Sequence, residues 1–471
     1  MINRFSFFVF FTLLSLIPTK AQIVVNGSLP QCPGETLRLI LFNDYISFHE
    51  RTFATTQLDG QGRFSISIDT NAPIIAIFDV ALFREQWVLE PGKTYFLAAP
   101  VFRVDEQLNP RLSGQGIGFL PDSNDLLNPA LLALNTDFSH FLDTSFVALY
   151  RRHNLKPLQA FNMYLGSTYL AKNPIVASSA RYRLASLQLS LGSIKRKDAL
   201  TQFRLDSIQY ADFEYMQFWN EYFDHFLTSK DAKVSNLKLL ALVNHTSSFL
   251  ALSDSLRREP FLYNEELRNT VLLKALGELY FKPAFDETNI LLLLQDAVKV
   301  LPNKWQQTIA NGLLSKCKWL RRGTFPPALD GNDKDGNAYA LSQAKGKLVF
   351  ISFINSSCTA CLSNLELLRS VYEDNKNDLE VLTIITDRDS LQAQNLANLL
   401  NYNWKVLFVR NNYQLLDDYK VYSYPLELVL DKQGAIWQYP ARSLEEHLMP
   451  LLTNLPNKKP NRQGFQPIRK K

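Results

Sequence analysis

Two of the four cysteines in this 471-residue chain, Cys358 and Cys361, are three positions apart, a spacing that suits reversible disulfide chemistry. The apolar run 348–353 predicts a buried strand, and the polar turn 355–357 after it places Cys358 at the start of the next helix. The unpaired amide groups of a helix start favour the thiolate form of a cysteine over the thiol. Cys361 follows one turn later on the same helix face, where it should be more buried. We therefore expect Cys358 to attack a substrate disulfide and Cys361 to resolve the mixed disulfide by closing a Cys358–Cys361 bridge.

The same spacing could instead supply half of a tetrahedral zinc site, or a bridge with a purely structural role. Zinc would need a second pair of Cys or His ligands, and the six histidines are scattered without paired spacing. A structural or inactive pair remains an alternative. We expect redox chemistry that needs neither a metal ion nor another cofactor. The histidines are His49, His140, His153, His225, His245 and His447.

The other two cysteines, Cys32 and Cys317, lie far apart in regions of different pattern. Four cysteines are too few to brace a chain of this size with disulfides. A bridge between Cys32 and Cys317 is geometrically possible, but two buried thiols is the interpretation that we prefer.

Three regions with different hydrophobic patterns carry these cysteines, and the length also exceeds what one core normally serves, so we predict a multidomain protein. Residues 22–105 show short alternating runs separated by turns, which predict a β-rich, sandwich-like module. Residues 106–322 show helical periodicity and predict an α-helical region. Residues 323–456 alternate strand and helix patterns, which predict a central sheet covered by helices on both faces. The expected helices include 206–228, 236–256, 359–374, 390–401, 414–419 and 443–452, and the last region's expected strands are 348–353, 380–386, 405–409, 426–430 and 435–438.

The C-terminal region resembles thioredoxin-fold proteins of the TlpA/ResA type, which are exported thiol-disulfide oxidoreductases. This resemblance implies an α/β thioredoxin fold in which Pro425 is a cis-proline that faces the redox pair. It also implies that Tyr424 is a substrate-facing residue, beside which a peptide can bind. The matching segments are 335–338 (Asp-Gly-Asn-Ala), 345–347 (Lys-Gly-Lys), 419–425 (Tyr-Lys-Val-Tyr-Ser-Tyr-Pro) and 426–434, which ends in Asp-Lys-Gln-Gly.

Several positions depart from the usual family pattern. Ile354 and Ser357 stand in the turn before the first cysteine, where the family usually has aromatic residues. Asn364 replaces an acidic residue three positions beyond the second cysteine, and Tyr424 is bulkier than the usual residue before the cis-proline. These replacements predict altered substrate contacts and altered proton handling at the second cysteine.

The altered turn also motivates a second hypothesis, a non-catalytic binding or scaffolding protein that uses a thioredoxin-like docking domain. A third possibility, thiol peroxidase activity, would require a Pro-x-x-x-Thr-x-x-Cys arrangement, and none leads into Cys358. The β-rich region is similar to modules that precede such thioredoxin domains in exported bacterial proteins, notably in its turn Asp59-Gly60-Gln61-Gly62.

The N-terminus has the three-part layout of a secretory signal peptide: Asn3-Arg4, an apolar run over 5–17, and a small residue at Ala21. We therefore predict that residues 1–21 are a signal peptide cleaved near Ala21, and that the mature protein is periplasmic. The apolar run is shorter than the roughly 20 residues that a membrane helix needs, so we expect no stable membrane span.

Charge argues against a nucleic-acid partner. The net charge is +5, and many basic residues gather in a predicted solvated tail over 457–471, with no basic face interleaved with aromatic residues. The expected partners are protein thiols and disulfides, together with a membrane or periplasmic redox donor.

Overall fold

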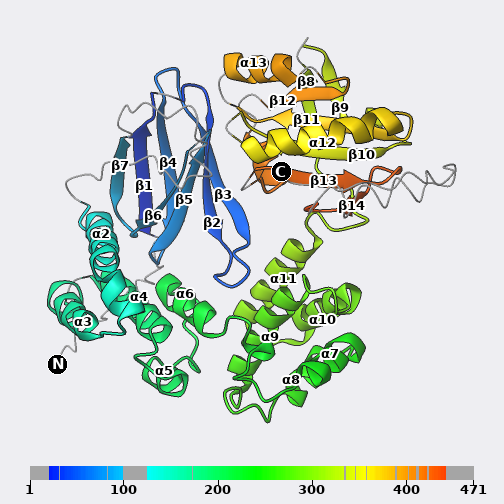
Figure 1. The fold of residues 1–471 in the computed structure, drawn as a ribbon. Coiled ribbons are helices and arrows are strands. Elements are labelled where there is room, and N and C mark those ends of the chain that lie inside the picture. The colour runs from blue at the N-terminus through cyan, green and yellow to red at the C-terminus, as the bar shows by residue number, and fades with distance from the viewer. Residues whose placement is uncertain are drawn as a thin grey trace, which may run out of the picture.

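A computed structural model describes residues 21–98 and 125–441, apart from short gaps at 31, 82, 172, 334–335, 345, 357, 388–389, 401, 410–412 and 422–423. Along the chain these residues form a β-rich part, a helical part and a part of mixed strands and helices (Figure 1). The predicted signal peptide up to residue 20, the predicted helix 443–452 and the basic tail lie outside the described residues. Within the described chain, none of the helices combines the length with the hydropathy that a membrane crossing requires.

The β-rich part contains two sheets that share one hydrophobic cluster. Its strands are β1 (Ala21–Ser28), β2 (Thr36–Phe42), β3 (Glu50–Gln57), β4 (Arg63–Thr70), β5 (Ile74–Val80), β6 (Phe83–Leu89) and β7 (Thr94–Ala98). In one sheet β1 pairs antiparallel with β4 and parallel with β7. The other sheet has the antiparallel order β3-β2-β5-β6. Alternation builds the shared cluster: Phe64, Ile66 and Ile68 of β4 are buried, and the residues between them are exposed.

The helical part runs from residue 127 to residue 318. Its helices are α2 (Leu127–Phe146), α3 (Lys156–Thr168), α4 (Pro174–Ser190), α5 (Arg196–Gln202), α6 (Phe213–Tyr222), α7 (Asn236–His245), α8 (Phe249–Ser255), α9 (Glu265–Leu279), α10 (Glu287–Val300) and α11 (Lys304–Lys318), with short π- and 3₁₀-helical turns at Val147–Arg151 and Phe226–Thr228. Polar side chains accept hydrogen bonds from the first turns of many of these helices. Apolar faces of the helices pack into two large clusters.

Two of the predicted helices were wrong in their extent. The expected helix over 236–256 is two helices, because Ser248 lies in an extended conformation and its side chain accepts from the backbone N–H of Ala251 at 3.4 Å. The expected helix over 206–228 begins only at Phe213, where Asp212 accepts from the N–H of Tyr215 at 3.1 Å. In both cases a local polar cap sets the helix start inside a continuing apolar pattern.

The C-terminal part is built on one seven-stranded sheet with the order β14-β13-β10-β11-β12-β8-β9. Its elements are β8 (Asp330–Asp333), β9 (Ala338–Ala340), a 3₁₀ turn (Leu341–Ala344), β10 (Leu348–Ile354), α12 (Thr359–Asn375), β11 (Leu379–Ile385), α13 (Ser390–Leu400), β12 (Lys405–Phe408), α14 (Tyr413–Asp418), β13 (Leu426–Leu430) and β14 (Ile436–Gln438). Apolar residues of α12 and α13 pack on one face of the sheet, and those of α14 pack on the other face. Helices therefore cover both faces, as the alternating pattern predicts.

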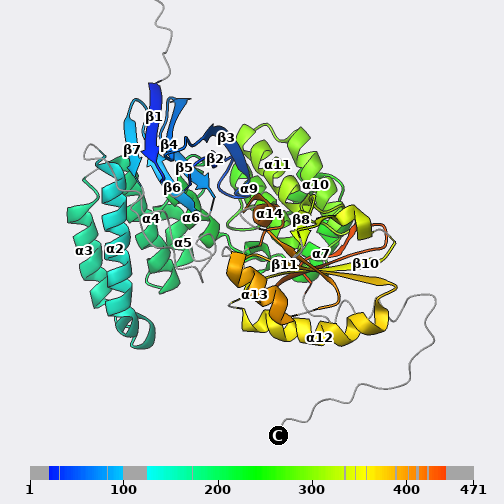
Figure 2. The same ribbon diagram turned by 90° about the horizontal axis from the view of Figure 1, so that it is seen from above.

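The C-terminal part contacts both of the preceding parts. Arg38 on β2 bonds to the carboxylate of Asp417 on α14 at 3.2 Å. Beyond the end of α11, the indole Nε1 of Trp319 donates to the carbonyl of Asp418 at 2.9 Å. Figures 1 and 2 show the side of the β-rich part formed by β3 and β2 facing the C-terminal part.

Candidate functional site

A strand, a turn and a helix start position the two cysteines of the close pair. β10 lies between β11 and β13, and each of its seven residues is buried. The chain leaves the sheet after Ile354, and Cys358 is the N-cap residue of α12. Its Sγ accepts a hydrogen bond from the N–H of Cys361 at 3.1 Å. A sulfur in this place meets the positive end of the helix dipole, which favours a thiolate when the pair is reduced.

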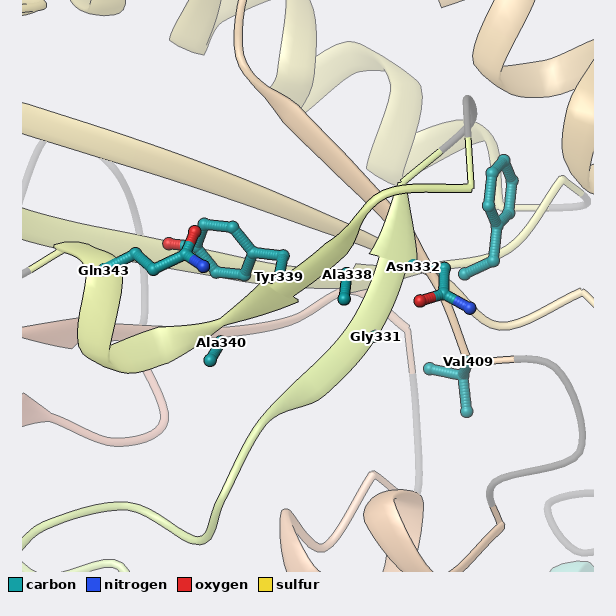
Figure 3. Close-up of a pocket in the computed structure, with 8 residues that line it drawn as sticks. Gly331, Asn332, Ala338, Tyr339, Ala340, Gln343 and Val409 are labelled. Atoms are coloured by element: carbon teal, nitrogen blue, oxygen red, sulfur yellow. The ribbon is translucent and has the colours of Figure 1, made fainter.

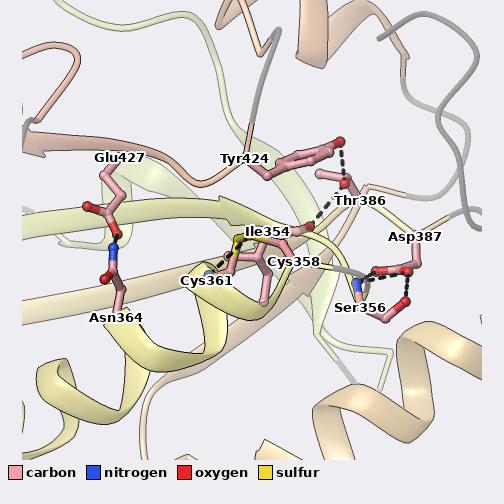
Figure 4. Close-up of a disulfide and its surroundings, with 9 residues drawn as sticks. All are labelled: Ile354, Ser356, Cys358, Cys361, Asn364, Thr386, Asp387, Tyr424 and Glu427. Carbon is pink, nitrogen blue, oxygen red and sulfur yellow. Dashed lines mark hydrogen bonds between the residues drawn. A yellow bond between two sulfur atoms is a disulfide. The ribbon is translucent and has the colours of Figure 1, made fainter. Parts of the chain in front are cut away.

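Cys358 and Cys361 form a disulfide, with their Cα atoms 5.3 Å apart (Figure 4). The two residues differ in exposure: Cys358 is half-buried, whereas Cys361 is 0% exposed and belongs to the cluster under α12. A second molecule can therefore reach Cys358 much more readily than Cys361.

The loop before β13 lies against this pair. The Tyr424-Pro425 peptide bond is cis, and Leu426 directly after it pairs with Phe353 at the end of β10. Tyr424 packs against the same cluster as both cysteines. The structure thus gathers Cys358, Cys361, Tyr424 and Pro425, the predicted site residues, at one end of the sheet.

The residue that follows β11 fixes the ring of Tyr424. The hydroxyls of Tyr424 and Thr386 share a hydrogen bond at 2.6 Å. Thr386 also reaches the carbonyl of Ile354 with its hydroxyl at 3.0 Å and with its backbone N–H at 2.9 Å. The proline loop, β11 and the end of β10 are therefore joined at the side of the disulfide (Figure 4).

The next residue, Asp387, holds the turn before the first cysteine. Its carboxylate accepts from the backbone N–H of Ser356 at 2.9 and 3.1 Å, and the Ser356 hydroxyl donates to it as well. Ser357, which departs from the family pattern, lies outside the described residues. Asp387 therefore brings a negative charge to the turn that leads into Cys358.

A buried carboxyl group, that of Glu427, bonds to a side chain of α12. Glu427 on β13 is 4% exposed, and the side-chain amide of Asn364 donates to its Oε1 at 3.2 Å. Burial raises the pKa of the Glu427 carboxyl above its ordinary value, and the hydrogen bond from Asn364 opposes that rise. Glu427 pairs across the strands with Ser352, whose buried Oγ has no hydrogen-bond partner among the described residues.

Sequence reasoning missed Thr386, Asp387, Glu427 and Ser352 as members of the site. The pattern 426–430 predicts a strand, and the Glu between two leucines in it is a usable signal of a polar group in a buried place. Thr386 and Asp387 become neighbours of the redox turn through the pairing of β10 with β11, which a single sequence does not specify.

Two other features of the described chain lie apart from the cysteine pair. Asp224, His225 and Glu278 form a set of possible metal ligands in the helical part, where the ammonium of Lys274 already lies 2.6 Å from Glu278. A hollow of about 430 Å³ lies beside β8, β9 and the end of β12 (Figure 3). The residues that line it are Gly331, Asn332, Ala338, Tyr339, Ala340, Gln343, Phe408 and Val409.

Cys32 and Cys317 are buried in two different hydrophobic clusters, one in the β-rich part and one in the helical part. Burial raises the pKa of the Cys317 thiol to about 12. This placement agrees with the preferred interpretation of two buried thiols and leaves Cys317 a poor nucleophile at neutral pH.

Comparison with known proteins gives matches to the C-terminal part. Residues 323–439 match the AhpC/TSA family. Thiol-disulfide oxidoreductase ResA of Bacillus cereus is 24% identical over 150 residues, which are 32% of this chain and 82% of that protein. ResA of Bacillus subtilis is 23% identical over 172 residues, which are 36% of this chain and 92% of that protein.

Among solved structures, the thioredoxin domain of a thiol-disulfide oxidoreductase from Bacteroides vulgatus is similar, with 22% identity and a TM-score of 0.27; the match covers 28% of this chain and 98% of that one. An exposed lipoprotein thioredoxin from Streptococcus pneumoniae is 28% identical with a TM-score of 0.25, covering 27% of this chain and 99% of that one. The sequence matches confirm the predicted TlpA/ResA-like family for the C-terminal part, its thioredoxin fold and its assignment as an oxidoreductase enzyme.

Proposed function

We propose that this chain is an exported thiol-disulfide oxidoreductase in which the Cys358–Cys361 pair exchanges between disulfide and dithiol with protein substrates. The observation that carries the proposal is the unequal placement of the two sulfurs. Cys358 caps α12 and is half-buried, whereas Cys361 is fully buried beside it. An accessible attacker with a protected partner is the arrangement that a two-step exchange needs.

In the reducing direction, the thiolate of Cys358 attacks one sulfur of a substrate disulfide. A mixed disulfide forms, and the other substrate sulfur leaves with the electron pair of the broken bond. The thiolate of Cys361 then attacks Sγ of Cys358, which closes the Cys358–Cys361 bond and releases the second substrate thiolate. The substrate gains two electrons and the enzyme loses two, so a periplasmic or membrane redox donor would have to restore the dithiol. The oxidising direction is the same sequence reversed.

Substrate binding is assigned to Tyr424 and Pro425. Because proline has no backbone N–H, Pro425 cannot donate a hydrogen bond to a neighbouring strand. The backbone of the residue before it is then free to pair with an extended peptide. The bond between the hydroxyls of Tyr424 and Thr386 holds the Tyr424 ring at the side of the disulfide. A peptide that presents its disulfide to Cys358 would therefore cross this loop.

The rest of the proposed organisation follows the sequence pattern. A signal peptide over residues 1–21 would direct the chain to the periplasm. The β-rich module (22–105), in which the two sheets share one cluster, is proposed to be a β-sandwich, followed by the helical region (106–322) and the thioredoxin-like domain (323–456). The shared cluster supports the first of these assignments.

A trapping experiment tests the proposal. Cys361→Ser should accumulate a mixed disulfide between Cys358 and substrate proteins, because the resolving thiol is gone while the attacking thiol remains. Cys358→Ser should trap nothing and lose disulfide reduction, and Cys317→Ser, which removes a remote buried thiol, should leave reduction unchanged.

The proposal is wrong if the wild-type protein fails to reduce a test disulfide and Cys361→Ser traps no partner. A double variant without both cysteines of the pair that still captures partners and supports function would favour the scaffolding protein instead.

A further inference from the structure

We propose that Glu427 exchanges the proton of Cys361 during resolution, with the hydroxyl of Ser352 as the relay between them. The inference rests on the proposed exchange reaction and names the groups that handle its proton. It also names an acidic group that can serve the second cysteine in a chain where Asn364 stands in place of the family's usual acidic residue.

Ser352 lies on the same face of the sheet as the buried cysteine. Along β10, side chains alternate between the two faces of the sheet. Phe350 and Ile354, two positions before and after Ser352, belong to the cluster that contains Cys361, whereas Ile351 and Phe353 belong to the cluster on the other face. Ser352 therefore points to the face of the sheet that α12 and α13 cover.

Glu427 lies on the same face. It is directly opposite Ser352 in the antiparallel pair of β10 and β13, and opposed residues project to the same side of a sheet. Its bond to Asn364, one turn after Cys361 on α12, fixes the carboxyl under the redox helix. Figure 4 shows Asn364 and Glu427 meeting beside the helix turn that holds the disulfide.

Ser352 has the chemistry that a relay requires. A hydroxyl both donates and accepts, and within the part of the chain that the structure describes this one is buried without a hydrogen-bond partner. Burying a hydroxyl without a hydrogen bond costs folding free energy, so an unbonded hydroxyl at a site suggests that it has a function there. In the oxidised structure the Ser352 hydroxyl bonds to neither Glu427 nor Cys361; once the pair is reduced, rotation of the hydroxyl toward both groups lets it pass one proton on while taking another.

Two linked proton transfers come before the attack. The thiol of Cys361 gives its proton to Oγ of Ser352, while Ser352 gives its own hydroxyl proton to the carboxylate of Glu427. The Cys361 sulfur then attacks Sγ of Cys358; the Cys358–Cys361 bond forms, the bond from Cys358 to the substrate breaks, and the electron pair leaves on the substrate sulfur, which takes a proton from water. When the bridge is reduced again, Cys361 leaves as a thiolate and recovers the proton by the reverse path.

The surroundings of the carboxyl favour its protonated form more than water does. Burial holds the pKa of Glu427 above that of an ordinary carboxyl, which brings it closer to the working pH. From β14, Trp437 packs against the cluster on this face, and the guanidinium of Arg322 is stacked over its ring at 3.8 Å from the ring centre. Asn364 of α12 bonds to the carboxyl, and Cys361 of α12 and Ser352 of β10 are the other titratable and polar groups on this face of the sheet.

The test separates the two chemical steps in one protein. An aromatic disulfide that releases a coloured thiolate is mixed with the reduced full-length protein. The first release reports attack by Cys358, and the second reports resolution by Cys361. In the wild type we expect the rate of the second release to rise with pH through the titration of Glu427.

Glu427→Gln keeps the size of the side chain and can still accept from Asn364, but it cannot take a proton. We expect its second release to lose this part of the pH profile and to be roughly 10²-fold slower at pH 7, with the first release unchanged. Ser352→Ala should slow the second release in the same way, and it serves as the independent test if Glu427→Gln does not fold. Asn364→Ala should move the midpoint to higher pH, because the bond that lowers the Glu427 pKa is removed.

The matched control is Glu380→Gln, which removes a carboxylate from the neighbouring strand β11, where Glu380 lies 3.5 Å from the ammonium of Lys347. It should leave both releases unchanged. A wild-type pH profile in both Glu427→Gln and Ser352→Ala would overturn the relay while leaving the exchange reaction intact. Absence of the first release in the wild type would instead overturn the proposed function itself.

Discussion

The hydroxyls of Tyr424 and Thr386 meet at 2.6 Å beside the disulfide, and this bond joins the loop of the cis-proline to the end of β11. Tyr424→Phe removes it and leaves the ring. We expect a loss of about 1 kcal/mol in the free energy of unfolding, since a net hydrogen bond contributes about that much. Urea unfolding of Tyr424→Phe, Thr386→Val and the double variant measures the coupling. Losses that simply add in the double variant would show that the two hydroxyls do not stabilise each other.

Asp387 places a carboxylate at the turn before Cys358, and its negative charge should oppose formation of the Cys358 thiolate. Asp387→Asn should therefore speed alkylation of Cys358 at pH 6, by roughly two- to fivefold for a partly screened charge. The rate is measured with iodoacetamide in a Cys361→Ser background. Glu366→Gln, which removes an exposed carboxylate bonded to Arg369, is the control. Equal rates in both variants would contradict the expected effect of Asp387.

Arg38 joins two carboxylates of very different burial. Its Nη2 lies 2.8 Å from Asp79, whose side chain is 1% exposed, and 3.2 Å from Asp417 on α14, whose side chain is 23% exposed. Arg38→Ala should lower the free energy of unfolding of the β-rich part by about 3 kcal/mol, because a buried charge loses a bonded cation. Asp417→Ala should cost about 1 kcal/mol or less, because it removes a half-exposed partner. Urea unfolding compares the two variants, and equal losses would be the contrary result.

The buried carboxyl also predicts how stability depends on pH. The pKa of Glu427 is raised in the folded protein, so the folded state holds the proton more firmly than the unfolded state. The wild type therefore loses stability as the pH rises above the ordinary carboxyl value of 4.5 toward the raised folded value. Glu427→Gln has no such loss. Its melting temperature relative to the oxidised wild type should be higher at pH 7.5 than at pH 4.5, and a difference that shrinks with pH would contradict this origin.

Local patterns in the sequence were enough to predict much of the C-terminal fold. The apolar run before Cys358, the polar turn and the helical stripe after it predict the strand, turn and helix start that hold the pair, because each is set by residues close in sequence. The proline loop could be named by its resemblance to a family. Helix extents in the middle region were less predictable, since Ser248 and Asp212 start helices where the apolar pattern runs on.

The supporting groups of the site could not be predicted in the same way. Thr386 and Asp387 reach the redox turn only because β11 lies next to β10 in the sheet, and Glu427 meets Ser352 through the register of β13. Strand order and register depend on the whole fold. The ionisable side chain of Glu427 inside a predicted strand was nonetheless visible in the sequence, and such a residue in a buried strand often indicates a functional position.

In a protein that exchanges disulfides, the remaining cysteines could form incorrect bridges with the redox pair. Four cysteines can be joined as two bridges in three different ways, and only an unfolded chain brings all of them within reach of one another. Once folded, Cys32 and Cys317 lie 4% and 2% exposed in two separate clusters. Incorrect disulfide pairing is thereby confined to the interval between synthesis and folding. In the folded protein, Cys358 and Cys361 are the pair that other molecules can reach.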